Sequence, residues 1–291
     1  MRTLGIDLAT EPGRTAACSV DWGADFAYAE VHDQSATDDA LVRWCATADK
    51  VGIDCPFGWP EPFVAAVAAH QTGQPWPVAL EAGSAGRRDF AYRSTDLHIL
   101  EVTKAWPLSV STNLIGLTAM RCAVLLDRLA PVDRAGAGRL AEVYPAAALR
   151  RWDLWQAGYK TASGLAKLGG MVDALLQQVP GLRFAPGSEQ RCRTNHDAFD
   201  ALVSALVARL AATGRTVRPD GEEQCQRAVT EGWIHLPTSG QLADVFLGNA
   251  HPQVSGHESL TTCVPGAADV RVGPHGPSDG PGQDQGAVLD D

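Results

Sequence analysis

Short apolar runs separated by turn residues predict strands at the start of the chain. Residues 2–9 are apolar without a period of two, which is typical of a strand covered on both faces. Residues 14–20 and 26–31 follow as two further strands, each after a turn that contains glycine. Such tight turns predict an antiparallel meander in which the first strand can lie at the centre of the sheet.

A helix then carries the chain to a fourth strand. Thr37 and the two acids after it are typical of a helix start, and residues 50–54 predict the next strand. A helix between two strands indicates a crossover to a parallel position in the same sheet. Residues 139–144 predict a later core strand. The pattern therefore predicts an α/β fold with three antiparallel strands followed by parallel crossovers.

The remaining segments are assigned from periodicity and polarity. Residues 85–103 are expected to form a polar connection, which is either a solvated surface segment or a substrate-facing loop. Residues 113–129 predict an amphipathic helix, and residues 194–210 predict a final core helix whose apolar side chains fall within one wedge. The buried side of the helix at 113–129 is expected to carry Leu117, Met120, Val124 and Leu125.

Composition divides the chain into a globular part and a tail. Residues 1–237 have the apolar content of a packed domain, which we expect to be single and to contain helical insertions. In residues 250–291 Gly, Pro, Ser and Asp dominate, which predicts a disordered tail. No run approaches the roughly 20 apolar residues that span a bilayer. We therefore expect a soluble, cytoplasmic protein with no membrane partner.

The charge distribution bears on nucleic-acid binding. The formal net charge is −10, and from His251 onward six acidic residues stand against Arg271 alone, a net of −5. The rest of the chain is only mildly acidic, so a local basic groove for nucleic acid is compatible with this composition. The cysteines are never spaced C-x-x-C, which argues against a zinc knuckle.

Two acids occupy equivalent places at the ends of strands. Asp7 ends the apolar run of the first strand, and Asp54 ends the strand that follows the crossover helix. A carboxylate buried at such a position needs a proton, hydrogen bonds or a cation. Each acid alone could simply hold backbone amides in a turn, but two at neighbouring strand ends favour metal or catalytic ligands.

The last core helix carries a second pair of acids. Asp197 and Asp200 lie beside its buried stripe, at the N-terminal end. Asn195 or Thr194 can cap the helix, and an acid in the first turn complements the helix dipole, which explains Asp197 but explains Asp200 less well. Glu142, in the later strand, is either a cross-strand partner or a further ligand.

Polar residues outside the strands are candidates for substrate contacts. Arg93 and Asp96 lie in the polar connection, where a guanidinium could meet phosphate oxygens, and Lys160 lies in a loop before a later helix. Together with acids on two strands and a helix, they fit a hydrolase that cuts phosphodiesters with two divalent ions about 3.5–4 Å apart. Because close carboxylates repel one another, ion binding and assembly of the site should be coupled.

At these residues the sequence resembles the family of predicted nucleases with a ribonuclease H-like fold that is known as domain of unknown function 429. The resemblance covers about residues 1–237. It implies a mixed five-stranded sheet flanked by helices and a metal-dependent nuclease activity. The motifs are Gly-Ile-Asp at 5–7, Gly-Ile-Asp-Cys-Pro-Phe-Gly at 52–58, Arg93 with Thr95 and Asp96, Glu-Val-Tyr-Pro at 142–145, Tyr159 with Lys160, His-Asp-Ala-Phe-Asp-Ala at 196–201 and Glu-Gly-Trp-Ile at 231–234.

The resemblance also implies roles for individual residues. The ligands of Mg²⁺ or Mn²⁺ would be Asp7, Asp54, Asp197 and Asp200, with Glu142 as a further candidate and His196 as a helper in proton transfer or a packing residue. Ribonucleases H carry a glutamate on the first crossover helix, whereas the acids near that position here, Asp38 and Asp39, resemble helix caps. Unless Glu142 substitutes for that glutamate, the site would bind one ion or none.

Three functions are compatible with these observations. The first is a divalent-metal-dependent nuclease that hydrolyses DNA or RNA. The second is a non-catalytic binding module that retains the fold. The third is a phosphotransferase of the actin and sugar-kinase type, although the sequence Asp7-Leu8-Ala9 lacks the glycine that such a phosphate loop needs two residues after the acid.

Overall fold

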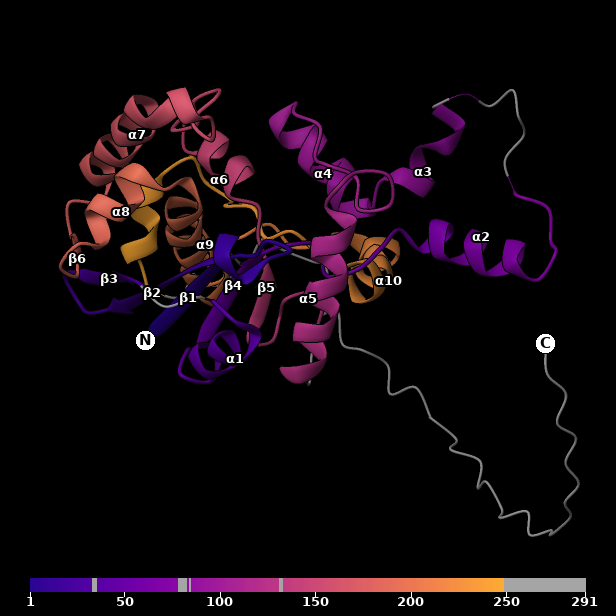
Figure 1. The fold of residues 1–291 in the computed structure, drawn as a ribbon, viewed down its shortest axis with the longest axis horizontal. Helices are drawn as coiled ribbons and strands as arrows, with labels where there is room; N and C mark the ends of the chain where they lie inside the picture. Colours follow the sequence, from indigo (N-terminus) through magenta and orange to yellow (C-terminus); the bar gives the residue numbers. More distant parts are fainter. Residues whose placement is uncertain (33–35, 78–82, 84, 131–132, 249–291) are drawn as a thin grey trace, which may run out of the picture.

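A six-stranded mixed sheet forms the centre of the fold (Figure 1). The computed structural model describes residues 1–32, 36–77, 83, 85–130 and 133–248, so the tail predicted at 250–291 lies outside the described residues. The strand order is β5-β4-β1-β2-β3-β6. The strands are β1 (Arg2–Asp7), β2 (Ala16–Trp22), β3 (Ala27–Val31), β4 (Lys50–Asp54), β5 (Leu140–Glu142) and β6 (Leu182–Phe184).

The topology confirms the predicted ribonuclease H-like α/β fold. β1 pairs antiparallel with β2 and β2 pairs antiparallel with β3, whereas β4 lies parallel to β1 and β5 lies parallel to β4. The structure adds a sixth strand to the five expected, because β6 pairs parallel with β3 at the far edge. At three residues, β6 is too short to leave a period in the sequence.

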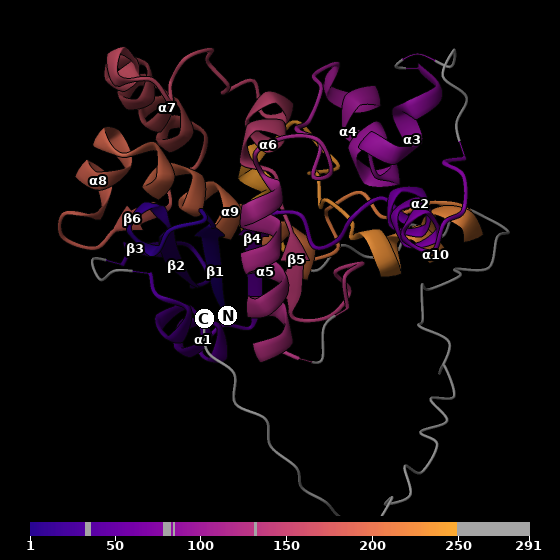
Figure 2. The same ribbon diagram turned by 45° about the vertical axis from the view of Figure 1, so that its right-hand side comes forward.

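Helices cover both faces of the sheet (Figures 1 and 2). On one face, α1 (Asp38–Ala46) and α5 (Gly116–Arg128) pack against Leu4 and Ile6 of β1. On the other face lie α7 (Leu165–Gln178), α8 (Ser188–Thr194) and α9 (His196–Ala212). Because alternate residues of a strand face opposite sides, β1 turns Leu4 and Ile6 toward one face and Gly5 toward α9 on the other.

A group of helices lies beyond the β5 edge of the sheet (Figure 2). It contains α2 (Glu61–Gln71), α3 (Arg88–Ala91), α4 (Ser94–Thr103) and α10 (Gly221–Glu231), while α6 (Pro145–Arg151) follows β5. The segment 232–237 contributes isolated bridges of Ile234 with Glu142 and of Pro237 with Thr216. Within the described ranges, no helix is both long and apolar enough to cross a bilayer.

The prediction of a polar connection at 85–103 was wrong, because most of this segment is helical. The backbone N–H of Arg93 donates to Asp96 Oδ2 at 3.0 Å, which closes a capping box at the start of α4. The start signal was therefore present in the sequence, but the helix has no clear apolar stripe to reveal it.

The predicted buried face of α5 was also largely wrong. Leu117, Met120 and Val124 are 64%, 58% and 56% exposed, and only Leu125 of the four predicted residues is buried. Ala119 and Cys122 face the core instead. Apolar residues occur on both sides of this helix, and the smaller ones allow the closer approach to the sheet.

The closest contact between helix and sheet involves α9 and two glycines. Gly5 of β1 lies opposite Gly52 of β4 in the parallel register. A Cβ atom at Gly5 would lie 2.0 Å from the carbonyl oxygen of Ala201, and one at Gly52 would lie 2.5 Å from that of Ser204. Because glycine has no side chain, the backbone of α9 lies directly on the centre of the sheet.

We expect Gly5→Ala to destabilise the protein strongly, because the added methyl group would meet backbone atoms that cannot rotate away. Overpacking of this kind costs roughly 1–3 kcal/mol or more. Gly13→Ala is the matched control, since nothing lies within 4 Å of a Cβ atom at that position. Urea unfolding followed by circular dichroism measures both variants, and equal stability of the two would contradict this account of the contact.

Candidate active site

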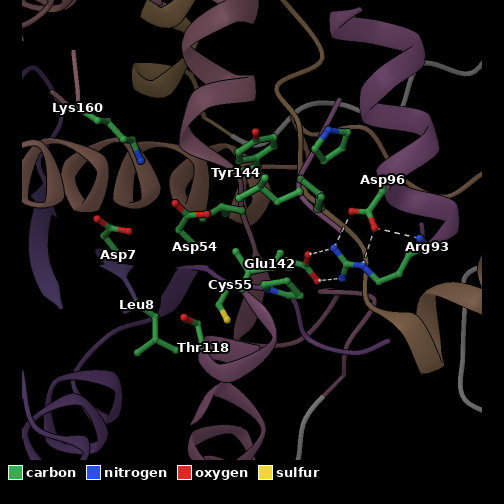
Figure 3. Close-up of a pocket in the computed structure, with 16 residues that line it drawn as sticks. Asp7, Leu8, Asp54, Cys55, Arg93, Asp96, Thr118, Glu142, Tyr144 and Lys160 are labelled. Carbon is green, nitrogen blue, oxygen red and sulfur yellow. Dashed lines mark hydrogen bonds and ion pairs between the residues drawn. The ribbon is translucent and has the colours of Figure 1, made fainter. Parts of the chain in front are cut away.

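The ends of β1 and β4 place two carboxylates side by side. Asp7 and Asp54 are direct partners in the parallel register. They share the strand face of Gly5 and Gly52, which is the face that α9 covers. Both acids line a cavity of about 250 Å³ together with Lys160 and Glu142. Figure 3 shows Asp7 and Asp54 next to one another, with the ammonium of Lys160 directed toward them.

The third acid, Asp200, is completely buried and held by two side chains of one loop. Lys160 Nζ lies 2.5 Å from Asp200 Oδ2. The hydroxyl of Tyr159 donates to the same carboxylate, at 3.0 and 3.1 Å from its two oxygens. Asp200 does not itself line the cavity. The sequence singled out Asp200 and Lys160 separately, but their pairing depends on how the loop at 156–161 folds back over α9.

Burial and mutual repulsion raise the pKa values of these acids. Burial, followed by the charges of Asp54 and Asp200, raises the pKa of Asp7 well above its usual value. Burial also raises the pKa of Asp54 to about 7, although the charge of Lys160 acts in the opposite direction. Burial raises the pKa of Asp200 despite its bonds to Lys160 and Tyr159. A cation bound between such carboxyl groups would stabilise their ionised forms and replace their protons.

Asp197 and His196 lie nearer to solvent at the start of α9. Asn195 caps this helix, because its side chain accepts from the backbone N–H groups of Asp197 and Ala198. His196 Nδ1 lies 2.8 Å from Asp197 Oδ1, and the two side chains are 31% and 24% exposed. The charge of Asp197 contributes to the raised pKa of Asp7, so the two acids are close enough to interact.

Glu142 and Asp96 are joined by the buried guanidinium of Arg93. Arg93 is 2% exposed, and its Nη1 and Nη2 donate to the two oxygens of Glu142 at 2.9 and 2.7 Å. Its Nε and Nη2 donate to Asp96 at 3.1 and 2.9 Å, and Nη1 also donates to the carbonyl of Glu231. All five N–H groups of Arg93 thus have protein acceptors. Although this cluster borders the cavity, its geometry is that of a structural link between α4 and β5.

Glu231 is a buried acid that the sequence motifs contain but to which they give no role. Its Oε1 accepts from the backbone N–H of Glu61 at 2.9 Å, and its Oε2 accepts from that of Ser94 at 2.8 Å. One carboxylate therefore caps the N-termini of both α2 and α4, where the helix dipole favours negative charge. Tyr144 and Thr118 are further cavity residues that were missed, because neither belongs to an acidic pattern.

The cavity offers oxygen ligands that suit a hard cation, but only part of a complete coordination shell. Carboxylate oxygens are the ligands that Mg²⁺ and Mn²⁺ prefer, and Mg²⁺ commonly binds one or two carboxylates and completes its shell with water and substrate oxygens. Asp7 and Asp54 meet that requirement. Within the described part of the chain, no group of three or more His, Cys, Asp or Glu residues is arranged to hold a metal ion. Water and substrate would therefore have to supply the other ligands.

We expect Asp54→Asn to stabilise the metal-free protein at about pH 8 and to lose this advantage as the pH falls. The pKa of Asp54 is about 7 in the folded protein against 3.8 for an ordinary aspartate. Between these values the folded state binds the extra proton, so its stability falls as the pH rises. The expected gain in the free energy of unfolding at about pH 8 is on the order of 1–3 kcal/mol. Each kcal/mol corresponds to a rise of roughly 2–4 °C in the melting temperature.

Thermal unfolding in EDTA at about pH 5 and at about pH 8 measures this difference. The comparison of variant with wild type removes contributions common to both, such as that of buried His235, whose pKa is lowered to about 3 and which destabilises the fold in acid. A difference between variant and wild type that is the same at both pH values would contradict the raised pKa of Asp54.

Arg93→Met tests whether Arg93 is a structural or a substrate-binding residue. Loss of the guanidinium would leave Glu142 and Asp96 buried without their cation, which costs about 3–5 kcal/mol. Arg128→Met is the control, because its partner Asp39 is exposed and we expect little change. Urea unfolding measures both. A stable Arg93→Met protein with weakened nucleic-acid binding would instead support the substrate-binding role.

Comparison of the sequence with known proteins identifies the family of this chain. No curated protein matches the chain, and no solved structure matches it. The family model described as "Protein of unknown function (DUF429)" matches residues 5–224, a range that includes Asp7, Asp54, Lys160 and Asp200. The chain, whose sheet has the ribonuclease H-like strand order, therefore belongs to the DUF429 family.

Proposed function

We propose that this protein is a divalent-metal-dependent nuclease that hydrolyses phosphodiester bonds. The observation that carries the proposal is the pair Asp7 and Asp54, which stand in register at the carboxyl ends of two central parallel strands and face an open cavity. The ribonuclease H-like strand order and the family assignment support it. Mg²⁺ or Mn²⁺ is the proposed cofactor, and DNA or RNA is the proposed substrate.

The residues of the cavity have distinct tasks in this proposal. Asp7 and Asp54 would hold the metal, which would supply a Lewis acid for the scissile phosphate and lower the pKa of bound water. Asp200 holds Lys160 at the mouth of the cavity, where its half-exposed side chain can contact a phosphate oxygen. Arg93, Glu142 and Glu231 keep the wall of the cavity in place.

Asp7→Asn is expected to abolish cleavage, because it removes one of the two carboxylates while it preserves the size of the side chain. Purified protein is incubated with Mg²⁺ or Mn²⁺ and single-stranded, duplex or branched DNA or with RNA. We expect wild type to cleave at least one of these substrates and Asp7→Asn to lose at least about a hundredfold in rate. EDTA should stop the wild-type reaction.

Asp127→Asn is the matched control, because it makes the same chemical change on the exposed side of α5. Its cleavage rate should equal that of wild type. Cleavage that persists in Asp7→Asn would point to a contaminating nuclease. No cleavage of any substrate by wild type, with unchanged binding of nucleic acid, would favour the non-catalytic binding module.

A further inference from the structure

Lys160 occupies the position in the acid cluster where a cation is expected. Its ammonium lies 2.5 Å from Asp200, and the hydroxyl of Tyr159 bonds the same carboxylate. The charge and both oxygens of Asp200 are therefore engaged by groups of the chain itself. Among the hydrogen bonds and ion pairs of the described residues, none involves the carboxylate of Asp7 or Asp54. These two are the carboxylates that remain available to an added ion.

The charge of the cluster limits how many ions it can accept. When ionised, the three carboxylates whose charges act on Lys160, those of Asp7, Asp54 and Asp200, carry three negative charges, of which Lys160 neutralises one. One divalent ion would neutralise the remaining two. The charge of Asp197 also acts on Asp7, but this side chain lies nearer to solvent and is 24% exposed. A second divalent ion would therefore leave positive charge uncompensated in a partly buried site, where charge repulsion is much stronger than in water.

The position of Asp200 leads to the same conclusion. A second ion would need Asp200 as a ligand, but Asp200 is 0% exposed, lies outside the cavity lining and has its carboxylate paired with Lys160. The Lys160 side chain is 47% exposed, and its charged end is anchored by the ion pair with Asp200. Lysine supplies a fixed single charge without the ligand requirements of a metal.

We propose that Lys160 takes the place of a second divalent ion, so that this site binds a single ion at Asp7 and Asp54. The inference rests on the proposed metal-dependent function and goes beyond it, because it assigns one ion where the sequence left one or two open and gives the residue that takes the place of the second. Lys160 is then a permanent part of the charge arrangement that meets the substrate phosphate.

Mn²⁺ binding to four proteins tests the inference without any measurement of cleavage. Isothermal titration calorimetry counts the bound ions at about pH 8, and electron paramagnetic resonance shows whether two Mn²⁺ ions lie close enough to couple, at about 4 Å. We expect one uncoupled ion in wild type and in Lys160→Arg, and two coupled ions in Lys160→Met. Lys167→Met is the matched control, because Lys167 donates to the carbonyl of Ala157 near the same loop; it should bind one ion.

Each outcome decides between the alternatives. Two coupled ions in wild type would overturn the inference, and if such a protein cleaves nucleic acid the proposed function still holds. One ion in a folded Lys160→Met protein would also overturn it, because the lysine would then not exclude the second ion. Absence of Mn²⁺ binding in all four proteins would overturn the metal-dependent function and the inference together. Circular dichroism confirms that each variant is folded.

Discussion

The contact of α9 with the centre of the sheet determines where every acid of the site lies. Gly5 and Gly52 bring the helix backbone onto β1 and β4, and the hydroxyl of Thr3 donates to the carbonyl of Ala205 in the same contact. This depth places the first turns of α9 beside the carboxyl ends of the strands. Asp200 therefore interacts electrostatically with Asp7 and Asp54, although both lie far from it along the chain. Any side chain at either glycine would lift the helix and separate these charges.

A second buried contact fixes the helices beyond β5 to the site. Arg93 joins α4 to β5 through Glu142, and Glu231 joins the end of α10 to the starts of α2 and α4. Both contacts use charged groups in the interior, where a single missing partner is costly. These contacts hold α4 and β5, which border the cavity, in a fixed arrangement.

The sequence predicted those parts of the fold that depend on local patterns. The apolar runs that end at Asp7 and Asp54 identified two central strands, and the helix between them indicated a parallel neighbour, so the pair of acids could be anticipated. The apolar wedge of α9 was likewise visible in its period. These features follow from short-range chemistry that a single sequence contains.

The rest required tertiary information. Leu117 and Met120 looked like core residues because α5 is apolar on two sides, and the choice between the sides depends on what packs there. Arg93 looked like a surface residue because its two acidic partners come from different segments. The ion pair of Lys160 with Asp200 depends on a loop returning to a helix forty residues later. None of these contacts leaves a periodic trace.

The caps provided by Glu231 have a consequence for the order in which the molecule is made. Asp7, Asp54, Lys160 and Asp200 all leave the ribosome before Glu231 does, yet the helices that carry the cavity wall lack their shared cap until that residue is available. A nascent chain that ends before this point holds all the acids of the site but not the finished enclosure. Completion of the cavity wall at α4 is thereby tied to one of the last segments that the structure describes.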